Sequence, residues 1–334
     1  MNQQKHSILN SKIKESFQNL SGKNIFISGG TGFFGKSFLD LFIKHAQNFN
    51  IQLTILSRSP EDFLRSHSKY NHPNIQWIKG DITDFEFPKH NFEIILHFAT
   101  PADAKLNIEQ PDVMAQIITH GMIHILDFAK ACGCKNFLFA SSGAVYGPQP
   151  SEITHIPESY VGAPNPASAD AAYGEAKRYA ELLGCIAARK NNFKFKIARC
   201  FTFIGTHLNQ NGLFAIANFI KDAKNNTTID IKGDGTTYRS YLYADDLVVW
   251  LLTILNKGTN FEIYNVGSDL DLTIADLARA VQKVINPDVK IKIHQQPESG
   301  AKPTKYVPSV NKARTELELD VWTSLAEAIQ KSKI

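Results

Sequence analysis

The sequence is poor in cysteine, which occurs only four times among 334 residues, at positions 132, 134, 185 and 200. So few cysteines in so long a chain exclude a disulfide framework and are typical of a reducing compartment. The pair in Cys132-Gly-Cys134 has neither a second cysteine pair nor a histidine cluster beside it. We therefore predict a cytoplasmic protein with ordinary thiols and no metal site.

Long hydrophobic runs are also missing. No stretch of about 18 apolar residues occurs, so the sequence predicts no membrane-spanning helix. The first segment, MNQQKHSILNSKIKESFQNLSGK, is polar and lacks the apolar centre of a signal peptide. We treat residues 1–22 as an N-terminal extension, which forms either a short amphipathic helix through Ile13, Phe17 and Leu20 or a frayed segment.

Neither sign of charge is in large excess: the chain has 36 lysines and arginines and 32 acidic residues, which gives a net charge of +4. The basic residues are scattered and form no concentrated run. Such a surface suits anionic small molecules at least as well as nucleic acid, and its plainest role is solubility. We therefore predict neither a nucleic-acid partner nor a membrane partner.

What the sequence does contain is a regular alternation of β-forming runs and helical patterns. The predicted strands span residues 24–29, 51–58, 75–82, 92–99, 136–147 and 193–205, and the predicted helices 33–46, 114–132 and 171–190. These strands are apolar on both faces, which is typical of a parallel sheet covered by helices on both sides. We predict an α/β fold in which a doubly wound Rossmann sheet occupies residues 23–200.

The pattern is looser after residue 205. It indicates helices at 213–226 and 273–285, strands at 259–268 and 289–296, and a strand–turn–strand–helix unit at 228–255. We predict that residues 201–334 mainly form a smaller α/β substrate-binding lobe, with 237–267 returning to the Rossmann domain. That lobe would cover the carboxyl ends of the parallel strands, where ligands bind in such sheets. The segments HFATPADAK (97–105) and NQNGLFAIANF (209–219) are expected to line the pocket.

A glycine-rich turn follows the first predicted strand in NIFISGGTGFFGKSFLDLF. Gly29 would permit the tight turn, Gly32 would let a pyrophosphate approach the main chain, and Gly35 would let the helix pack on the strand. The free amides and the positive dipole at the helix start would bind phosphate. We predict a dinucleotide site here, with the cofactor contacted by Gly29, Thr31, Gly32, Phe33, Phe34 and Gly35. The plainer alternative is a tight strand-to-helix turn without a ligand.

The end of the second predicted strand bears on the choice of cofactor. A site for NAD usually has Asp or Glu about 20 residues after the glycines, on the ribose 2′-hydroxyl. The chain instead has Ser57 and Arg58, which suit a 2′-phosphate. We predict NADP(H) over NAD(H), which stays open as the alternative. Further cofactor contacts are predicted at the ends of the next two strands, at Asp81, Ile82, Phe98, Ala99 and Thr100; Asp81 could equally cap a helix.

Tyr173 and Lys177 stand four residues apart on the last predicted helix of the sheet domain, so their side chains share one face. A lysine beside a tyrosine is expected to lower the pKa of the phenol and to hold the nicotinamide ribose. Ser142, at the end of the preceding strand, could share a hydrogen bond with a substrate carbonyl or alcohol. Together the three predict proton transfer beside a hydride transfer. By itself such a Tyr-Lys pair is usually an exposed helix face.

In GGTGFFG, SSGAVYG, YGEAK, GDGTTYRSYLYADD and YNVGS, the chain resembles the extended short-chain dehydrogenases/reductases, in their nucleotide-sugar epimerase/dehydratase group. The resemblance covers roughly residues 23 to 330. It implies a Rossmann fold, a nucleoside-diphosphate sugar as substrate, Tyr173 as general acid/base, and Lys177 and Ser142 as its partners. It also implies substrate contacts at Ser142, Gly143, Tyr173, Thr202 and Arg239, with Arg239 on the diphosphate. A homodimer through the helices around 113–131 and 172–190 is implied as well.

Departures from the group's pattern limit the reaction. Its 4,6-dehydratases carry an Asp-Glu pair after the catalytic serine or threonine, where this chain has Gly143 and Ala144. Its UDP-glucuronate decarboxylases are similar in the loop PESYVGAPNPASADAAYGEAKRYAE, but they use a glutamate that Ala144 replaces. Thr202 stands where many members have an asparagine that touches the substrate.

Four functions therefore stay in view. We predict an NADP-dependent reductase of a 4-keto-6-deoxyhexose linked to a nucleoside diphosphate, since Ser57 and Arg58 favour net reduction. A C4 epimerase that recycles its cofactor is the alternative, and a decarboxylase comes third. An NADP(H)-binding sensor or scaffold is the non-enzyme alternative, although such proteins often lose the tyrosine or lysine that this chain keeps.

Overall fold

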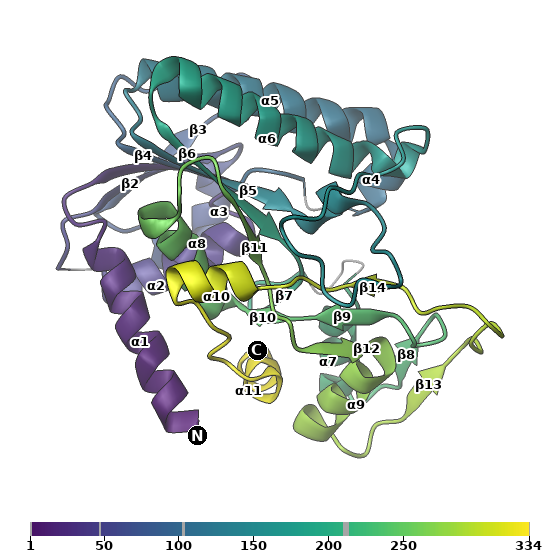
Figure 1. Ribbon diagram of the computed structural model, residues 1–334. Helices are drawn as coiled ribbons and strands as arrows, with labels where there is room; N and C mark the ends of the chain where they lie inside the picture. The colour runs from purple at the N-terminus through teal and green to yellow at the C-terminus, as the bar shows by residue number, and fades with distance from the viewer. Residues whose placement is uncertain (1, 47, 102–103, 210–213, 334) are drawn as a thin grey trace.

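Seven parallel strands form the main sheet of the computed structural model, which describes residues 2–46, 48–101, 104–209 and 214–333 (Figure 1). The strand order is β3-β2-β1-β4-β5-β6-β11, and all six pairs are parallel. The strands are β1 (Asn24–Ser28), β2 (Gln52–Ser57), β3 (Ile75–Lys79), β4 (Ile94–His97), β5 (Asn136–Ser142), β6 (Lys194–Cys200) and β11 (Ile263–Val266). The order reverses direction between β1 and β4, which is the switch point of a doubly wound sheet. The predicted Rossmann architecture is confirmed.

Helices cover both faces of the main sheet because alternate strand residues point to opposite sides. On one face, α5 (Pro111–Ala131) and α6 (Ala172–Asn191) pack on Phe26, Ile95 and Phe137. On the other, α1 (Asn2–Gln18), α2 (Phe33–His45) and α8 (Ala244–Lys257) pack on Ile25 and Ile27. Figure 1 shows α5 and α6 above the sheet and α1, α2 and α8 below it. Within the described part of the chain, no helix is both long and apolar enough to cross a membrane.

The N-terminal segment forms the helix α1, one of the two alternatives that the sequence allowed. Leu9, Ile13, Phe17 and Leu20 are buried in the core that α1 shares with α2 and α8. The ring of Phe17 lies 5.6 Å from that of Phe38 on α2. A hydrogen bond of 2.8 Å from Lys257 Nζ to Glu15 Oε1 joins α1 to the end of α8. The segment is therefore a packed part of the sheet domain.

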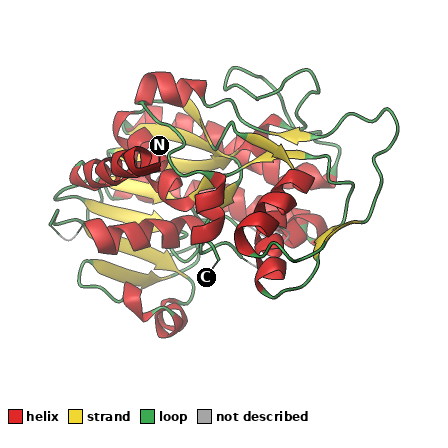
Figure 2. Cartoon of the chain, turned by 90° about the horizontal axis from the view of Figure 1, so that it is seen from below, coloured by secondary structure: helices red, strands yellow, loops and turns green. Residues whose placement is uncertain are grey.

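A smaller lobe lies beside the main sheet, and Figure 2 shows the two parts next to one another. It contains α7 (Ala215–Lys224), β8 (Ile229–Ile231), β9 (Tyr238–Ser240), β12 (Asp271–Thr273), α9 (Ile274–Ile285), β13 (Ile291–Ile293), β14 (Lys305–Tyr306) and α11 (Leu325–Lys331). Its core joins α7, α9 and α11 through residues such as Phe219, Leu277 and Ile329. The small three-stranded sheet has the order β12-β9-β14.

The chain enters the smaller lobe more than once. After β6 it forms β7 (Phe203–Ile204), which pairs with β10 (Leu242–Tyr243). It passes through α7, β8 and β9 and returns to the main sheet with α8 and β11 before the second visit through β12, α9, β13 and β14. The helix α10 (Asn311–Leu317) then packs near β11 and α8. The described elements also include the short helices α3 (Pro60–Ser66) and α4 (Ala104–Glu109).

Each predicted strand of the main sheet is longer than the observed strand, and two of them show the physical reason. The prediction of 136–147 ends at Ser142, because the Ser142 hydroxyl accepts a 3.1 Å hydrogen bond from the Ala144 amide and begins the 3-10 turn η2 (Gly143–Tyr146). The prediction of 193–205 divides into β6 and β7, since the Phe201 amide donates to Val266 of β11 and the Leu242 amide donates to Thr202.

Candidate active site

The glycine turn lies at the switch point of the main sheet, between β1 and α2. Gly29 has φ +78°, and a Cβ there would lie 2.6 Å from the amide nitrogen of Ala99 after β4. A Cβ on Gly35 would lie 2.3 Å from the Cα of Gly30, so only glycine lets α2 pack this closely. Gly32 is exposed, and a Cβ there would meet only the Gly29 carbonyl, at 3.4 Å. The three glycines thus have three different surroundings, and the open one is in the middle.

The start of α2 has the features of an anion site. Gly32 precedes α2 without a side-chain cap, so amides of the first turn lack a capping partner of that kind. Phe33 and Phe34 are half-buried, and both rings pack near Phe203, with centroids 6.3 and 5.2 Å from it. Thr31 is half-buried in the turn itself.

The ends of β2 and β3 bring basic residues to the edge where a 2′-phosphate is predicted. Ser57 is buried and accepts a 3.3 Å hydrogen bond from the Ser59 amide, whereas Arg58 is exposed. The register of the two strands pairs Ser57 with Lys79, so an exposed lysine ends the neighbouring strand. Sequence reasoning missed Lys79, because only the strand register brings it beside Ser57.

Asp81 and Ile82 follow β3. The carboxylate of Asp81 accepts hydrogen bonds from the Thr83 amide at 3.0 Å and the Thr83 hydroxyl at 2.8 Å, so it holds a local turn. Ile82 is buried, and its side chain comes close to α5 at Gly121, where a Cβ would lie 3.1 Å from Ile82 Cγ2. In this structure the Asp81 side chain acts within its own loop.

The end of β4 connects the glycine turn with Lys177. The Ala99 amide approaches the Ser28 hydroxyl at 3.4 Å, and the Phe98 ring lies 5.9 Å from that of Phe34. Lys177 Nζ donates to Thr100 Oγ1 and to the Ala140 carbonyl, each at 2.7 Å. The predicted pocket segments HFATPADAK and NQNGLFAIANF include residues 102–103 and 210–213, which lie outside the described residues.

Ser142 and Tyr173 lie together, although 31 positions separate them in the chain. Ser142 ends β5, and Tyr173 lies in the first turn of α6, where the Ser142 hydroxyl is near enough to affect the pKa of the phenol. Burial raises the pKa of Tyr173 to about 12, and the nearby Ser142 hydroxyl opposes that rise. The phenol is therefore protonated over the ordinary pH range and can donate its proton.

Lys177 lies one helical turn beyond Tyr173 and is buried, with only 2% of its surface exposed. Burial lowers its pKa to about 7, and the nearby Cys200 and Glu181 oppose this. Its ammonium group lies 4.6 Å from the ring centre of Phe139. We expected Lys177 to lower the pKa of Tyr173, but burial raises the pKa of the phenol and Lys177 is not among the groups that shift it.

Two further features fix α6, and sequence reasoning found neither. The Asn107 side chain on α4 accepts from the Tyr173 amide and donates to the Asp170 carbonyl, both at 3.1 Å. It caps the first turn of α6, whose own N-cap residue is an alanine without a side-chain hydrogen bond. The contact joins residues 66 positions apart, so no local sequence signal predicts it.

The second feature is a buried ion pair one turn beyond Lys177. Glu181 accepts from Arg199 Nη2 at 2.7 Å, from Arg199 Nε at 3.0 Å and from the Ser141 hydroxyl at 2.5 Å. The pair joins α6 to β5 and β6, the strands that end beside Ser142. Since both carboxylate oxygens are satisfied, the network holds the helix register rather than a ligand.

The smaller lobe contributes Arg239, whose position on β9 faces Tyr306 of β14 in the strand register. Its Nη1 donates to the Tyr238 carbonyl at 2.8 Å, and its guanidinium lies 5.6 Å from the Tyr306 ring centre. Asp246, seven positions further along the chain, accepts hydrogen bonds from the Trp322 and Thr323 amides. The arginine keeps further donors for a ligand.

Thr202 and Gly143, both predicted substrate contacts, are tightly packed. The Thr202 hydroxyl donates to the Ser240 carbonyl at 2.6 Å, so it pins the crossing into β10. A Cβ on Gly143 would lie 2.7 Å from the Tyr306 hydroxyl and 2.7 Å from Phe201 Cζ. The structure thus brings Ser142, Gly143 and Tyr173 together. The Thr202 hydroxyl instead forms a hydrogen bond with the main chain.

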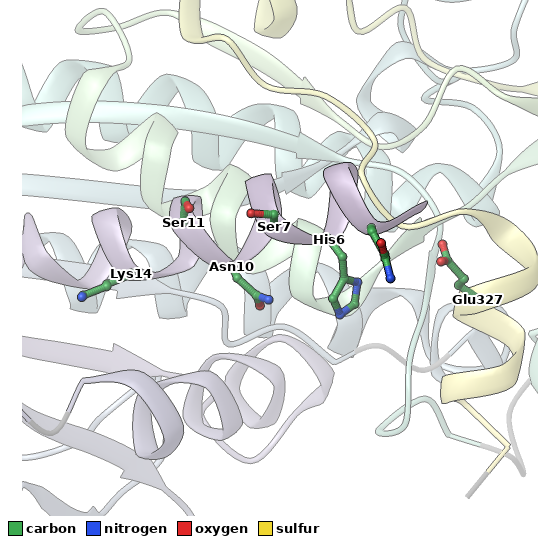
Figure 3. A pocket seen from close by; sticks show the side chains of 7 residues that line it. His6, Ser7, Asn10, Ser11, Lys14 and Glu327 are labelled. Atoms are coloured by element: carbon green, nitrogen blue, oxygen red, sulfur yellow. The ribbon is translucent and has the colours of Figure 1, made fainter. Parts of the chain in front are cut away.

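A surface groove lies elsewhere, between α1 and α11. Figure 3 shows the polar side chains along it, from His6 to Lys14 on α1 and Glu327 on α11. None of the predicted site residues lines it. In the described ranges of the chain, no group of three or more His, Cys, Asp or Glu side chains is arranged to hold a metal ion.

The strand order and the glycine turn at its switch point define a Rossmann-fold protein with a second, smaller lobe. Comparison with models of known protein families identifies the family within this class. The model of the NAD dependent epimerase/dehydratase family matches residues 25–267, so the chain belongs to that family.

Similar proteins cover nearly the whole chain. UDP-glucuronic acid decarboxylase 5 of Arabidopsis thaliana is 29% identical over 311 residues, covering 92% of this chain and 88% of that protein. The structure of UDP-glucose 4-epimerase from Thermotoga maritima, with UDP-glucose, matches with TM-score 0.78 and 23% identity, covering 93% of this chain and 97% of that one. UDP-glucuronic acid 4-epimerase from Bacillus cereus, in complex with NAD, matches with TM-score 0.76 and 19% identity, covering 93% and 95%. At these identities the two structures support the shared fold.

Proposed function

We propose that the protein is a cytoplasmic NADP-dependent reductase of a nucleoside-diphosphate sugar, acting on the 4-keto group of a 6-deoxyhexose. The observation that carries the proposal is the set formed by Ser142, Tyr173 and Lys177, which combines a protonated phenol with a buried amine. A protonated phenol suits a step that delivers a proton to a carbonyl oxygen. The free state of the cysteines that the structure describes fits a reducing compartment.

The residues of the glycine turn fit a nicotinamide dinucleotide. Gly29 and Gly35 lack room for a Cβ, Gly32 is open, and the start of α2 offers amides to phosphate. When bound, the cofactor would supply or accept a hydride. Arg58 and Lys79 would hold a 2′-phosphate at the end of β2 and β3, which is the reason to favour NADP(H) over NAD(H).

The chain's own groups have separate tasks in this proposal. Tyr173 gives the proton of its Oη to the substrate oxygen, and Ser142, at the end of β5, would hydrogen-bond that same oxygen. Lys177, when charged, stabilises the phenolate that remains. Arg239 binds the diphosphate of the substrate from the smaller lobe through the donors left free by Tyr238.

Decarboxylation of a UDP-linked uronic acid is the second candidate, because the Arabidopsis relative of that name is similar over 92% of this chain. The residues after Ser142 argue against decarboxylation, because the side chains of Gly143 and Ala144 cannot transfer a proton. The Ala144 amide is bonded to Ser142 and its carbonyl to the Gly147 amide. Epimerisation at C4, with internal recycling of the cofactor, is a third candidate.

The test is a panel of assays on the purified full chain. NADPH and NADH oxidation would be followed with a set of 4-keto-6-deoxy sugar nucleotides, and UDP-glucuronate and UDP-glucose would be incubated with each oxidised cofactor. We expect stoichiometric NADPH oxidation with one preferred keto sugar. Release of CO₂ from UDP-glucuronate, or an epimer without net NADPH use, would overturn the reductase proposal.

Tyr173→Phe distinguishes an enzyme from a sensor. We expect turnover to fall by at least about a thousandfold, while NADPH binding changes little, because the substitution removes only the proton donor. Tyr179→Phe is the matched control on the same helix, because it removes a hydroxyl and keeps the ring that the proposed dimer contact uses. Undiminished turnover in Tyr173→Phe would contradict the assigned role.

A homodimer through α5 and α6 is part of the proposal. Tyr179, Leu182 and Ile186 form an apolar stripe on α6 and are 49%, 54% and 52% exposed, and Ile123 on α5 is 44% exposed. Their spacing of three and four residues aligns the α6 members on one helix face. An exposed apolar stripe of this kind suits packing against a second copy.

A further inference from the structure

The segment that follows β4 contacts α6 at both residues of the Tyr-Lys pair. Thr100 lies soon after the end of β4, and its Oγ1 accepts a 2.7 Å hydrogen bond from Lys177 Nζ. Asn107, on α4, accepts a 3.1 Å hydrogen bond from the Tyr173 amide. The described parts of this segment therefore hold the helix at its first turn and hold the lysine at its ammonium group.

The hydroxyl of Thr100 is oriented as an acceptor. It donates its single proton to the Ala99 carbonyl at 2.7 Å, so its lone pairs are left for Lys177. The amide of the same Ala99 lies 3.4 Å from the hydroxyl of Ser28, the residue before the glycine turn. The acceptor for Lys177 is thus attached to main chain that borders the predicted cofactor site.

Lys177 donates to two neutral acceptors. An ammonium group has three N–H donors, and two of them reach Thr100 Oγ1 and the Ala140 carbonyl, each at 2.7 Å. The Ala140 carbonyl belongs to the main chain of β5 and is present whatever residue stands there. The Thr100 oxygen belongs to a side chain, so a substitution can remove it and leave the other bond in place.

The titratable groups that face Lys177 give it little opposite charge. The carboxylate of Glu181, one turn further along α6, is paired with Arg199. Burial, and then the charge of Lys177, lowers the pKa of His97 on β4 to about 3, so its imidazole is neutral at pH 7. Burial raises the pKa of Cys200 on β6 to about 12, so its thiol is neutral as well. The charge of the buried amine therefore depends on its hydrogen-bond acceptors.

We propose that Thr100 is a positioning residue: its hydroxyl oxygen holds the ammonium group of Lys177 at the end of β4 and stabilises the positive charge. The inference rests on the proposed function, in which charged Lys177 stabilises the phenolate that Tyr173 becomes. In this role Thr100 acts through Lys177 and transfers no proton itself. Burial keeps Tyr173 protonated before the transfer, with a pKa of about 12, so the lysine charge is needed only once the proton has left.

Thr100→Val removes the hydroxyl and keeps the size of the side chain, so Lys177 loses one acceptor. We expect the midpoint of the fall in kcat/KM with rising pH to move about one pH unit lower, because the lost hydrogen bond had favoured the charged amine. The loss of kcat/KM should then be about tenfold at pH 8 and less than about twofold at pH 5.5.

Two further variants separate this role from a structural one. Thr100→Ser keeps the hydroxyl and should restore the wild-type pH profile. Thr315→Val is the matched control, because it removes a threonine hydroxyl that bonds the main chain of α10, away from the site. A loss in Thr100→Val that is the same at every pH would show a structural defect and overturn the inference.

NMR of the lysine side chains tests the inference without turnover. The full chain would be labelled with ¹³C at the lysine ε-carbons, and the Lys177 signal identified by its absence in Lys177→Met. We expect its titration midpoint, near pH 7 in the wild type, to fall by about one unit in Thr100→Val and to return in Thr100→Ser. An unchanged midpoint in Thr100→Val would overturn the inference. The expected shift in a protein that turns over none of the assayed sugars would support the inference and count against the proposed function alone.

Discussion

At the scale of single residues, burial decides the chemistry of the site more than proximity does. Lys177 is enclosed by Thr100, the Ala140 carbonyl and the Phe139 ring, and its pKa is about 7 instead of the usual 10.5. Tyr173 keeps its proton because burial raises its pKa to about 12. Tyr173 is thus protonated at neutral pH, and Lys177, four residues further along the same helix, changes its charge near neutral pH.

The pH dependence of turnover follows from Lys177. Its lowered pKa means that the ammonium form is complete only below about pH 6 and is lost as the pH rises through about 7. If the charge stabilises the phenolate, kcat/KM should fall roughly twentyfold between about pH 6.5 and 8.5. The measurement is a pH profile of kcat/KM with saturating NADPH. A flat profile over this range would show that turnover does not need the lysine charge.

Cofactor choice is a second prediction at this scale. Arg58→Ala and Lys79→Ala should each weaken NADPH binding about tenfold and leave NADH binding nearly unchanged, since each removes a cation from the 2′-phosphate position. Fluorescence titration of both cofactors measures this directly. Glu61→Ala, an exposed residue on the neighbouring helix α3, is a control. Equal losses for both cofactors would contradict the assignment.

At the scale of elements, side chains from one element end or hold another. Asp246 in the first turn of α8 is buried and accepts from the Trp322 amide at 2.6 Å, the Thr323 amide at 3.1 Å and the Thr323 hydroxyl at 2.5 Å. It therefore ties α8 to the segment that leads into α11. Two of its partners are buried main-chain donors, which are costly to leave unpaired.

Asp246→Ala should lower the free energy of unfolding by about 2 to 4 kcal/mol, because it leaves two buried amides without a partner. Asp246→Asn keeps one acceptor oxygen and should lose less. Urea denaturation of the three proteins measures the difference. A loss equal in both variants would show that the charge, and not the acceptor, holds the segment.

The sequence predicts the βα elements of the main sheet well, because their apolar runs and helical periods are long. It predicts the places of Ser142 and Tyr173 for the same reason, since Ser142 ends a long strand and Tyr173 lies in the first turn of a long helix. The short strands β12 and β14 were missed, as two or three residues carry no period. Tyr306 was missed with β14, and Asn107 and Lys79 act across distances that only the folded chain brings together.

At the scale of the whole molecule, the exposed stripe on α6 gives a prediction of assembly. Each chain has a mass of 37.3 kDa, and we expect light scattering to give about twice that mass. Leu182→Glu should produce a monomer, because it buries a charge in an apolar contact. Lys224→Glu, an exposed residue on α7, is the control. A wild-type monomer would refute the dimer.

The strand β11 has a consequence for any attempt to divide the chain. It pairs with β6 along Ile197–Cys200, yet it follows the first visit of the chain to the smaller lobe. A fragment ending at Cys200 would leave β6 as a bare, apolar edge strand, a template for intermolecular pairing. Such a fragment should aggregate on expression. The sheet domain therefore needs a strand that comes after part of the smaller lobe, so the two lobes form a single folding unit.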